Sequence, residues 1–302
     1  MSVKQAQKAC KCNDTLANWG PTAEHRFPWE GVSGLLRRLL SKILRQIRRW
    51  WADPNYREYY RLATKYRTFP RYKEAEINCV LGRLLVPDVS SFIATFEEIF
   101  VNEIYAFKAK GESPIILDCG ANIGLSVIYF KRLYPKSKVI AFEADPKIAY
   151  YLKRNLESLG LTNVEVIVKA VWINDGIVSF FHEGADGGHI GDPAQSSQQV
   201  ECTRLRTYLE RMAVDFIKID IEGAEVEVIK DCRNLLSKPY GAFVEFHSIS
   251  GRPQGLGELI ASFEEHSFRV HVHAVHPLAR PFISGPPCSG MDLCLNLFFW
   301  KN

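Results

Sequence analysis

The sequence predicts an α/β protein: a doubly wound, mostly parallel sheet with an antiparallel last strand, preceded by an N-terminal helical extension. Two observations predict this fold. From residue 114 onward, short apolar strands alternate with helical segments, and such alternation is typical of a parallel sheet with helices on both faces. The first of these strands, 114–118, runs into a turn with glycines at positions 120 and 124, which is the arrangement of a nucleotide-type cofactor loop.

Length and composition place the chain among ordinary globular proteins. Its 302 residues can hold one large α/β domain and an extension, and its 47% of hydrophobic and 24% of charged residues are typical values. No apolar run reaches the ~18 residues that a membrane span needs, and residues 1–19 lack the apolar core of a secretory signal. The eight cysteines lack the spacing of a metal site, so we expect a reducing, cytoplasmic compartment.

The N-terminal part divides into a leader and an extension. Residues 1–30 are polar and irregular, and we expect them to be disordered. Residues 31–110 are expected to form a helical and β extension, with a helix near 55–66, a strand near 77–85 and a helix near 90–109. The domain that carries the cofactor loop is then expected to cover residues 111–302.

A basic amphipathic helix is predicted over residues 31–52. Its apolar stripe comprises Leu35, Leu36, Leu39, Leu40, Ile43, Leu44, Ile47, Trp50 and Trp51. Six basic residues and no acid accompany the stripe, as in helices that lie at an anionic membrane surface. Peripheral membrane contact, packing on the domain and docking to a partner protein all remain open. Since the whole chain carries +4, the remainder carries −2, and we expect no nucleic-acid partner.

The remaining elements follow in alternating order. Strands are expected at 114–118, 138–142, 163–168, 215–220 and 241–246, and helices at 123–134, 146–159, 223–236 and 255–266. Two final strands, 268–274 and 293–300, have no helix between them, so the last strand should insert antiparallel. This ending is unlike a dinucleotide-binding domain and is that of the class I methyltransferase fold, which is otherwise Rossmann-like. A polar insertion at 182–199 is either a substrate loop or a surface excursion.

The cofactor loop carries an acid where a phosphate-binding loop would not. Asp118 ends the first strand, and Gly120, Asn122 and Gly124 follow it. A carboxylate here would repel a pyrophosphate but suits a ligand with a positive charge, such as the amino acid end of S-adenosylmethionine. The glycines are expected to allow a tight turn and close approach of that ligand. Glu143, at the end of the second strand, is placed to bind ribose hydroxyls.

Four further polar residues follow the next two strands. Asp220 and Glu222 come after the strand at 215–220, while Glu245 and His247 end the strand at 241–246. The carboxyl ends of parallel strands meet at one edge of a sheet, so these side chains are expected beside the cofactor loop. Glu225, on the helix that follows, is expected to lie on a solvated face.

These motifs together resemble the FkbM family of S-adenosylmethionine-dependent methyltransferases. The resemblance covers about residues 90–300, and its most specific part is the run Lys-Ile-Asp-Ile-Glu-Gly-Ala-Glu at 218–225. It implies O-methylation of a hydroxyl, typically of a sugar in a glycan, glycolipid or natural product. Residues 1–60 have no counterpart in the family core. The adenine is then expected near Ala144, Ala170 and Val171.

Roles for the four polar residues follow from the chemistry of alcohols. The acceptor must lose a proton, and His247 is the expected general base because its ordinary pKa is near neutrality. Glu245 would orient it, Glu222 would hold the acceptor hydroxyl, and Asp220 would bridge cofactor and acceptor. Alternatively, Asp220, Glu222, Glu245 and His247 could bind Mg²⁺ or Mn²⁺ as a Lewis acid.

Two other functions are less well supported by the sequence. An NAD-type oxidoreductase predicts three glycines in a G-x-G-x-x-G frame, but here positions 118 and 122 are Asp and Asn. A non-catalytic, membrane-associated scaffold would be expected to have a damaged cofactor loop, and this loop is intact.

Overall fold

The computed structural model describes residues 46–182, 188–190, 198–277 and 290–301, together with Ser41, Leu44, Arg280 and residues 282–283. The chain divides into two units, residues 1–49 and 50–302, and the fold below belongs to the second unit. The predicted leader and most of the predicted helix at 31–52 lie outside the described residues. Within that helix, residues 46–52 are helical and exposed. No helix among the described residues is long and apolar enough to cross a bilayer.

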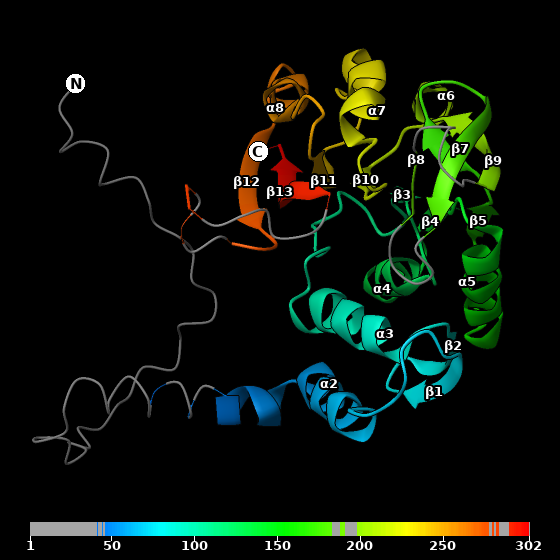
Figure 1. Ribbon diagram of the computed structural model, residues 1–302, viewed down its shortest axis with the longest axis vertical. Coiled ribbons are helices and arrows are strands. Elements are labelled where there is room, and N and C mark those ends of the chain that lie inside the picture. Colours follow the sequence, from blue (N-terminus) through cyan, green and yellow to red (C-terminus); the bar gives the residue numbers. More distant parts are fainter. Residues whose placement is uncertain are drawn as a thin grey trace, which may run out of the picture. The chain divides into compact units, whose positions relative to one another are not determined.

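A seven-stranded sheet forms the centre of the second unit, in the order β12-β13-β11-β10-β3-β4-β5 (Figure 1). The strands are β3 (Ile115–Cys119), β4 (Lys138–Phe142), β5 (Val164–Ile167), β10 (Phe216–Ile219), β11 (Gly241–Ile249), β12 (Arg269–Ala274) and β13 (Met291–Trp300). The strand β13 runs antiparallel to β11 and β12, whereas the pairs from β11 to β5 are parallel. The predicted doubly wound sheet with an antiparallel last strand is confirmed.

The alternation of side chains along each strand divides the core into two layers. Ile116, Phe216 and Phe243 pack on one face with the helices of the N-terminal extension and α4 (Leu125–Leu133). Leu117 and Ile217 pack on the other face with α6 (Leu205–Arg211), α7 (Glu225–Cys232) and α8 (Leu256–Glu264). Figure 1 shows α7 and α8 on one side of the sheet and α3 (Val89–Phe96) and α4 on the other. Because successive strand residues point to opposite faces, residues 118 and 218 belong to the face that the N-terminal extension covers.

Most predicted helices of the sheet domain are confirmed within about two residues, the usual uncertainty of helix ends. They are α4 (Leu125–Leu133), α5 (Pro146–Ser158), α7 (Glu225–Cys232) and α8 (Leu256–Glu264). The helix α7 begins two residues later than predicted, because Glu222 and Gly223 have φ values of 56° and 100°, outside the α-helical region. The helix then ends in the 3₁₀ turn η3 (Arg233–Leu235).

The N-terminal extension differs more from its prediction. It contains α2 (Pro54–Lys65), the hairpin β1 (Ala75–Cys79) and β2 (Gly82–Val86), α3 (Val89–Phe96) and the π-helical turn η2 (Glu97–Val101). The single strand expected at 77–85 was wrong, since the chain reverses at Gly82, where φ is 119°. The helix expected to reach 109 ends at Val101, and Glu103 with φ of 51° turns the chain away from it.

A second, four-stranded sheet was not predicted. Its order is β6-β9-β7-β8, and its strands are β6 (Ala170–Trp172), β7 (Gly176–His182), β8 (Gly188–Ile190) and β9 (Gln198–Arg204). The helix α6 (Leu205–Arg211) follows it and was also missed. Residues 183–187 and 191–197 of the predicted insertion lie outside the described residues, so the choice between a substrate loop and a surface excursion stays open.

Asn155 joins the extension to the cofactor loop. It is fully buried on α5, and its Oδ1 accepts a hydrogen bond of 2.7 Å from the Leu85 backbone N–H. Its Nδ2 donates to the backbone oxygens of Leu85, at 3.1 Å, and Ile123, at 3.0 Å. One side chain therefore joins the β-hairpin to Ile123 in the glycine loop.

We predict that Asn155→Ala lowers the free energy of unfolding by about 2–4 kcal/mol, because it leaves several buried backbone groups without partners. Urea denaturation monitored by circular dichroism measures the change. Asn78→Ala, on the exposed side of β1, is the matched control and should change stability by less than about 0.5 kcal/mol. Equal effects of the two substitutions would contradict the role given to Asn155.

Candidate active site

The two loop glycines are required by backbone packing. Gly120 has φ of 83°, and a Cβ on it would lie 1.9 Å from the Asp220 carbonyl oxygen. Gly124 has φ of 94°, and its Cβ would lie 2.6 Å from the side chain of Leu152. Protein atoms fill the Cβ position of each glycine, and the expectation that both glycines let a ligand approach stays a prediction. Gly120 nevertheless lines the cavity described below.

Lys218 is the central charge beneath this loop. It is 2% exposed and lies opposite Asp118 in the pairing of β10 with β3. Its Nζ is 3.6 Å from Asp118 Oδ1 and 3.1 Å from Asp220 Oδ2, and it donates to the Gly120 carbonyl at 2.6 Å. Burial opposes the charge, but the two carboxylates and Tyr105 raise the pKa of Lys218 well above its usual value.

The sequence analysis did not assign Lys218 a role, although a signal was present. A lysine inside the apolar strand Phe-Ile-Lys-Ile cannot stay buried without a counter-charge. Asp220 follows Lys218 by two positions. Residues two apart along a strand point to the same face of a sheet, so the two side chains were predictable on one face.

Asp118 lies deeper than expected. Its side chain is fully buried and does not line the cavity, and its Oδ2 accepts a hydrogen bond of 2.5 Å from Ser126 Oγ. Burial raises the pKa of Asp118, while Lys218 and Ser126 counter this effect. The expected contact with a ligand's ammonium group is corrected, because in this arrangement the positive partner of Asp118 is Lys218.

Glu143 holds the loop from the other side. Asn122, in the left-handed region with φ of 48°, donates its backbone N–H to Glu143 Oε2 at 2.8 Å. Glu143 Oε1 accepts from the Asp145 backbone N–H at 2.9 Å, and burial raises the pKa of Glu143 to about 7. Glu143 does not line the cavity, nor do Ala144, Ala170 and Val171. The ribose and adenine contacts therefore stay predictions.

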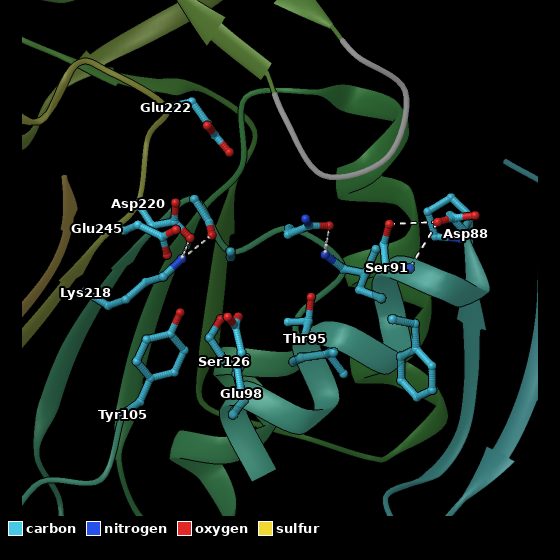
Figure 2. Close-up of a pocket in the computed structure, with 18 residues that line it drawn as sticks. Asp88, Ser91, Thr95, Glu98, Tyr105, Ser126, Lys218, Asp220, Glu222 and Glu245 are labelled. Atoms are coloured by element: carbon cyan, nitrogen blue, oxygen red, sulfur yellow. Dashed lines mark hydrogen bonds and ion pairs between the residues drawn. The ribbon is translucent and has the colours of Figure 1, made fainter. Parts of the chain in front are cut away.

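A cavity of about 170 Å³ opens between the loop, the ends of β10 and β11, and the N-terminal extension. Its polar lining residues are Asp88, Ser91, Thr95, Glu98, Tyr105, Asn122, Ser126, Lys218, Asp220, Glu222 and Glu245. In Figure 2, Lys218, Asp220 and Glu245 gather at one end, and Thr95 and Glu98 come from the helix below. The contribution of α3 and η2 was missed, since nothing in their sequence shows which sheet edge they cover.

The predicted acids Asp220, Glu222 and Glu245 all line this cavity. Burial and the nearby charge of Asp220 raise the pKa of Glu245 to about 8, although His247 and Lys218 act in the opposite direction. The Glu245 side chain is still 21% exposed. A carboxylate with a pKa near the working pH can accept a proton from a bound hydroxyl and release it again.

His247 does not have the environment of a general base. Its Nδ1 is 3.1 Å from Glu225 Oε1, and its Nε2 is 3.4 Å from Glu222 Oε2 and 3.7 Å from Glu245 Oε1. Burial disfavours the charged ring, but Glu225 and Glu222 outweigh this and raise the pKa of His247 well above its usual value. This shift opposes a role as proton acceptor, and the nearest partner of the ring is Glu225 rather than Glu245. The roles of His247 as base and of Glu245 as its orienting group stay predictions.

Glu225 is the residue that orients His247, and the expectation of a solvated face was wrong. Its side chain is 1% exposed. Besides His247, it contacts the backbone N–H groups of Gly223, at 3.0 Å, and Ile221, at 3.2 Å. An acid at the first residue of a helix, directly after a glycine turn, is the signal that could have identified it, because backbone N–H groups converge there.

The geometry brings candidate metal ligands together, but their chemistry fits an ion poorly. Ligand atoms of Asp220, Glu222 and His247 lie within 4.8 Å of one another. The Nδ1 atom of His247 already contacts Glu225 at 3.1 Å, and Glu225 raises the pKa of the ring, which opposes the neutral form that a metal ligand requires. We derive no step through Mg²⁺ or Mn²⁺.

The strand order and the position of the loop define a class I methyltransferase fold. Residues 118–270, just over half of the chain, match the Methyltransferase FkbM domain. The chain belongs to the FkbM methyltransferase family.

Similar proteins include Methyltransferase sdnD of Sordaria araneosa, 29% identical, with 45% of this chain and 66% of that protein covered. The 2-O-methyltransferase NoeI of Sinorhizobium fredii is 26% identical, with 44% of this chain and 63% of that protein covered. The chain thus spans less than two thirds of either relative. The crystal structure of an FkbM methyltransferase from Methylobacillus flagellatus is 18% identical, has a TM-score of 0.44, and is aligned over 82% of this chain and 59% of its own.

We predict that Glu225→Gln lowers the pKa of His247 toward its ordinary value of about 6.5, because the substitution removes the largest favourable charge on the ring. A pH titration of the histidine ring signals by NMR measures the shift, with His247→Gln identifying the resonance. Glu258→Gln, on the exposed surface of α8, should leave that pKa unchanged. If His247 titrated alike in both variants, Glu225 would not be its charge partner.

Proposed function

We propose that the protein is an S-adenosylmethionine-dependent O-methyltransferase that acts on a hydroxyl of a sugar. The observation that carries this proposal is the cavity that joins the glycine loop to Glu245, whose raised pKa suits it to accept a proton. The family membership supports methyl transfer. The NAD-type oxidoreductase receives no such support.

The residues present fit the cofactor. Gly120 and Asn122 line the cavity beside Asp220, and their backbone turn is held by Glu143 and Lys218. Gly120, Asn122 and Asp220 would hold the amino acid end, with Gly124 and the deeper Asp118 shaping the loop. Glu143 would bind the ribose, and Ala144, Ala170 and Val171 would lie near the adenine. When bound, S-adenosylmethionine supplies an electrophilic methyl group.

The remaining catalysis consists of positioning and proton transfer. Glu245 would accept the proton of the acceptor hydroxyl, while Asp220 and Glu222 would accept hydrogen bonds from neighbouring hydroxyls. His247, whose Nε2 lies 3.7 Å from Glu245 Oε1, lowers the pKa of Glu245 and would favour the ionised form of that base. The acceptor end of the cavity is rich in oxygen atoms, including those of Ser91, Thr95 and Glu98, which suits a polyhydroxylated acceptor such as a sugar. One relative is named a 2-O-methyltransferase, which supports a hydroxyl acceptor.

Isothermal titration of the full chain with S-adenosylmethionine, repeated with NAD⁺, tests the cofactor. We expect binding of S-adenosylmethionine alone. Lys218→Met should abolish it, because the loop loses its anchor and two buried carboxylates lose their counter-ion. Lys230→Met, at an exposed ion pair with Glu258, is the matched control. Binding of neither compound to the unaltered protein would instead favour a non-catalytic scaffold.

Glu245→Gln tests the proton acceptor. We expect it to lower the rate of S-adenosylhomocysteine formation by about 10²–10⁴ with unchanged S-adenosylmethionine affinity. The unaltered enzyme, assayed with methyl pyranosides of common hexoses, should show a rate that rises with pH up to about 8, because only the ionised carboxylate accepts a proton. A rate independent of pH between 6 and 9 (roughly the range in which such a base titrates) would count against Glu245.

We further propose that the helix at 46–52 attaches the protein to an anionic lipid surface. Large apolar side chains are exposed on and just before it: Leu44 by 53%, Ile47 by 48% and Trp51 by 78%. The surrounding sequence 31–52 carries six basic residues and no acid, and this combination is typical of interfacial helices. The lipid charge would attract the basic residues while the apolar side chains enter the headgroup region.

Flotation of the full chain with vesicles of phosphatidylcholine and phosphatidylserine measures this attachment. The combined substitutions Leu44→Ser, Ile47→Ser and Trp51→Ser should abolish flotation and leave S-adenosylmethionine affinity unchanged. Tyr150→Ser removes a comparably exposed side chain from α5 (54%) and should have no effect. Flotation that persists in the triple variant would exclude this helix as the attachment point.

A further inference from the structure

A second cavity, of about 510 Å³, lies next to the first on the same face of the sheet. The residues that line it include Glu98, Asn102, His271, His273, Asn296 and Phe298. Glu98 lines both cavities, so they meet at the turn η2. A volume of this size is typical of sites for small ligands.

The strand register leads from Glu245 directly to this cavity. Glu245 pairs with Asn296 across β11 and β13, and Asn296 pairs with His273 across β13 and β12. Directly paired residues point to the same face, and neighbouring strands are about 4.8 Å apart. A row of three polar side chains thus extends about 10 Å from the proposed proton acceptor, a reach set by two strand spacings.

Asn296, in the wall of this cavity, carries a hydrogen-bond acceptor that the protein does not use. The residue is 5% exposed, and its buried Oδ1 has no hydrogen-bond partner among the described residues. A buried amide oxygen without a donor costs about 1–3 kcal/mol, so proteins seldom keep one without a function. Beside it, the rings of Phe298 and His271, 5.8 Å apart between centroids, offer a flat apolar surface.

We propose that this second cavity binds a further sugar ring of the acceptor, next to the ring that is methylated. Asn296 Oδ1 would accept a hydrogen bond from a hydroxyl of that ring, His273 and Asn102 would bind others, and Phe298 would contact its apolar face. The acceptor is then an oligosaccharide or a glycoside of at least two rings rather than a monosaccharide. This inference rests on the proposed methylation of a sugar and specifies its substrate class.

Saturation-transfer difference NMR on the full chain tests the inference without requiring turnover. The probes are maltose, cellobiose and lactose, each compared with the methyl pyranosides of its component sugars. We expect at least one disaccharide to receive saturation on both rings. In Asn296→Ala its dissociation constant should rise about tenfold or more, the effect of losing one buried hydrogen bond, with the methyl pyranosides unaffected.

His273→Ala is the second variant, because this exposed residue of β12 can be changed with little effect on folding. It should weaken the same disaccharide. Val272→Ala, also exposed but on the opposite face of β12, is the matched control. Saturation of no disaccharide, or affinities that are equal in all variants, would overturn the inference. A parallel titration with S-adenosylmethionine reports separately on the proposed function, since Asn296, His273 and Val272 do not line the first cavity.

Discussion

The ammonium group of Lys218 joins three parts of the site at one point. It lies between the carboxylates of Asp118 and Asp220 and donates to the carbonyl of Gly120, so strands β3 and β10 and the loop share one buried cation. A charge taken out of water is strongly unfavourable unless such partners surround it. The position of the loop is therefore fixed by the need to neutralise Lys218, and the positions of Asn122, Gly120 and Asp220 along the cavity follow from it.

A second cluster of ionisable groups lies at the neighbouring strand end. The ring of His247 is enclosed by Glu225, Glu222 and Glu245, and Glu225 is its nearest partner. Burial and the charge of Asp220 raise the pKa of Glu245 to about 8, and His247, at 3.7 Å, counters them only in part. The charges that surround each of these carboxylates therefore set which of them can exchange a proton.

The central sheet could be predicted well from the sequence, because apolar strands that end in charged residues and alternate with helices are compatible with few other fold topologies. The sequence also located Asp220, Glu222 and Glu245 at one rim. It did not reveal the orientation of buried charges: Lys218, Glu225 and the protonation of His247 depend on partners from other strands and helices. The π-helical turn, the second sheet and the division of the N-terminal hairpin into two strands were missed as well, since periodicity alone does not distinguish one short strand from two, or a strand from part of a helix.

The segments α3 and η2 line the first cavity but lie outside the region that matches the family. The region that matches the family ends at residue 270 and begins at 118, whereas α3, η2 and β13 lie outside it. These outer segments supply Thr95 and Glu98 to the first cavity and Asn296 and Phe298 to the second. The matched region thus holds the loop and the charged rim, whereas part of the wall of each cavity comes from α3, η2 and β13, outside that region. A variant that exchanges these three segments would therefore change the walls of both cavities and leave the loop and the rim in place.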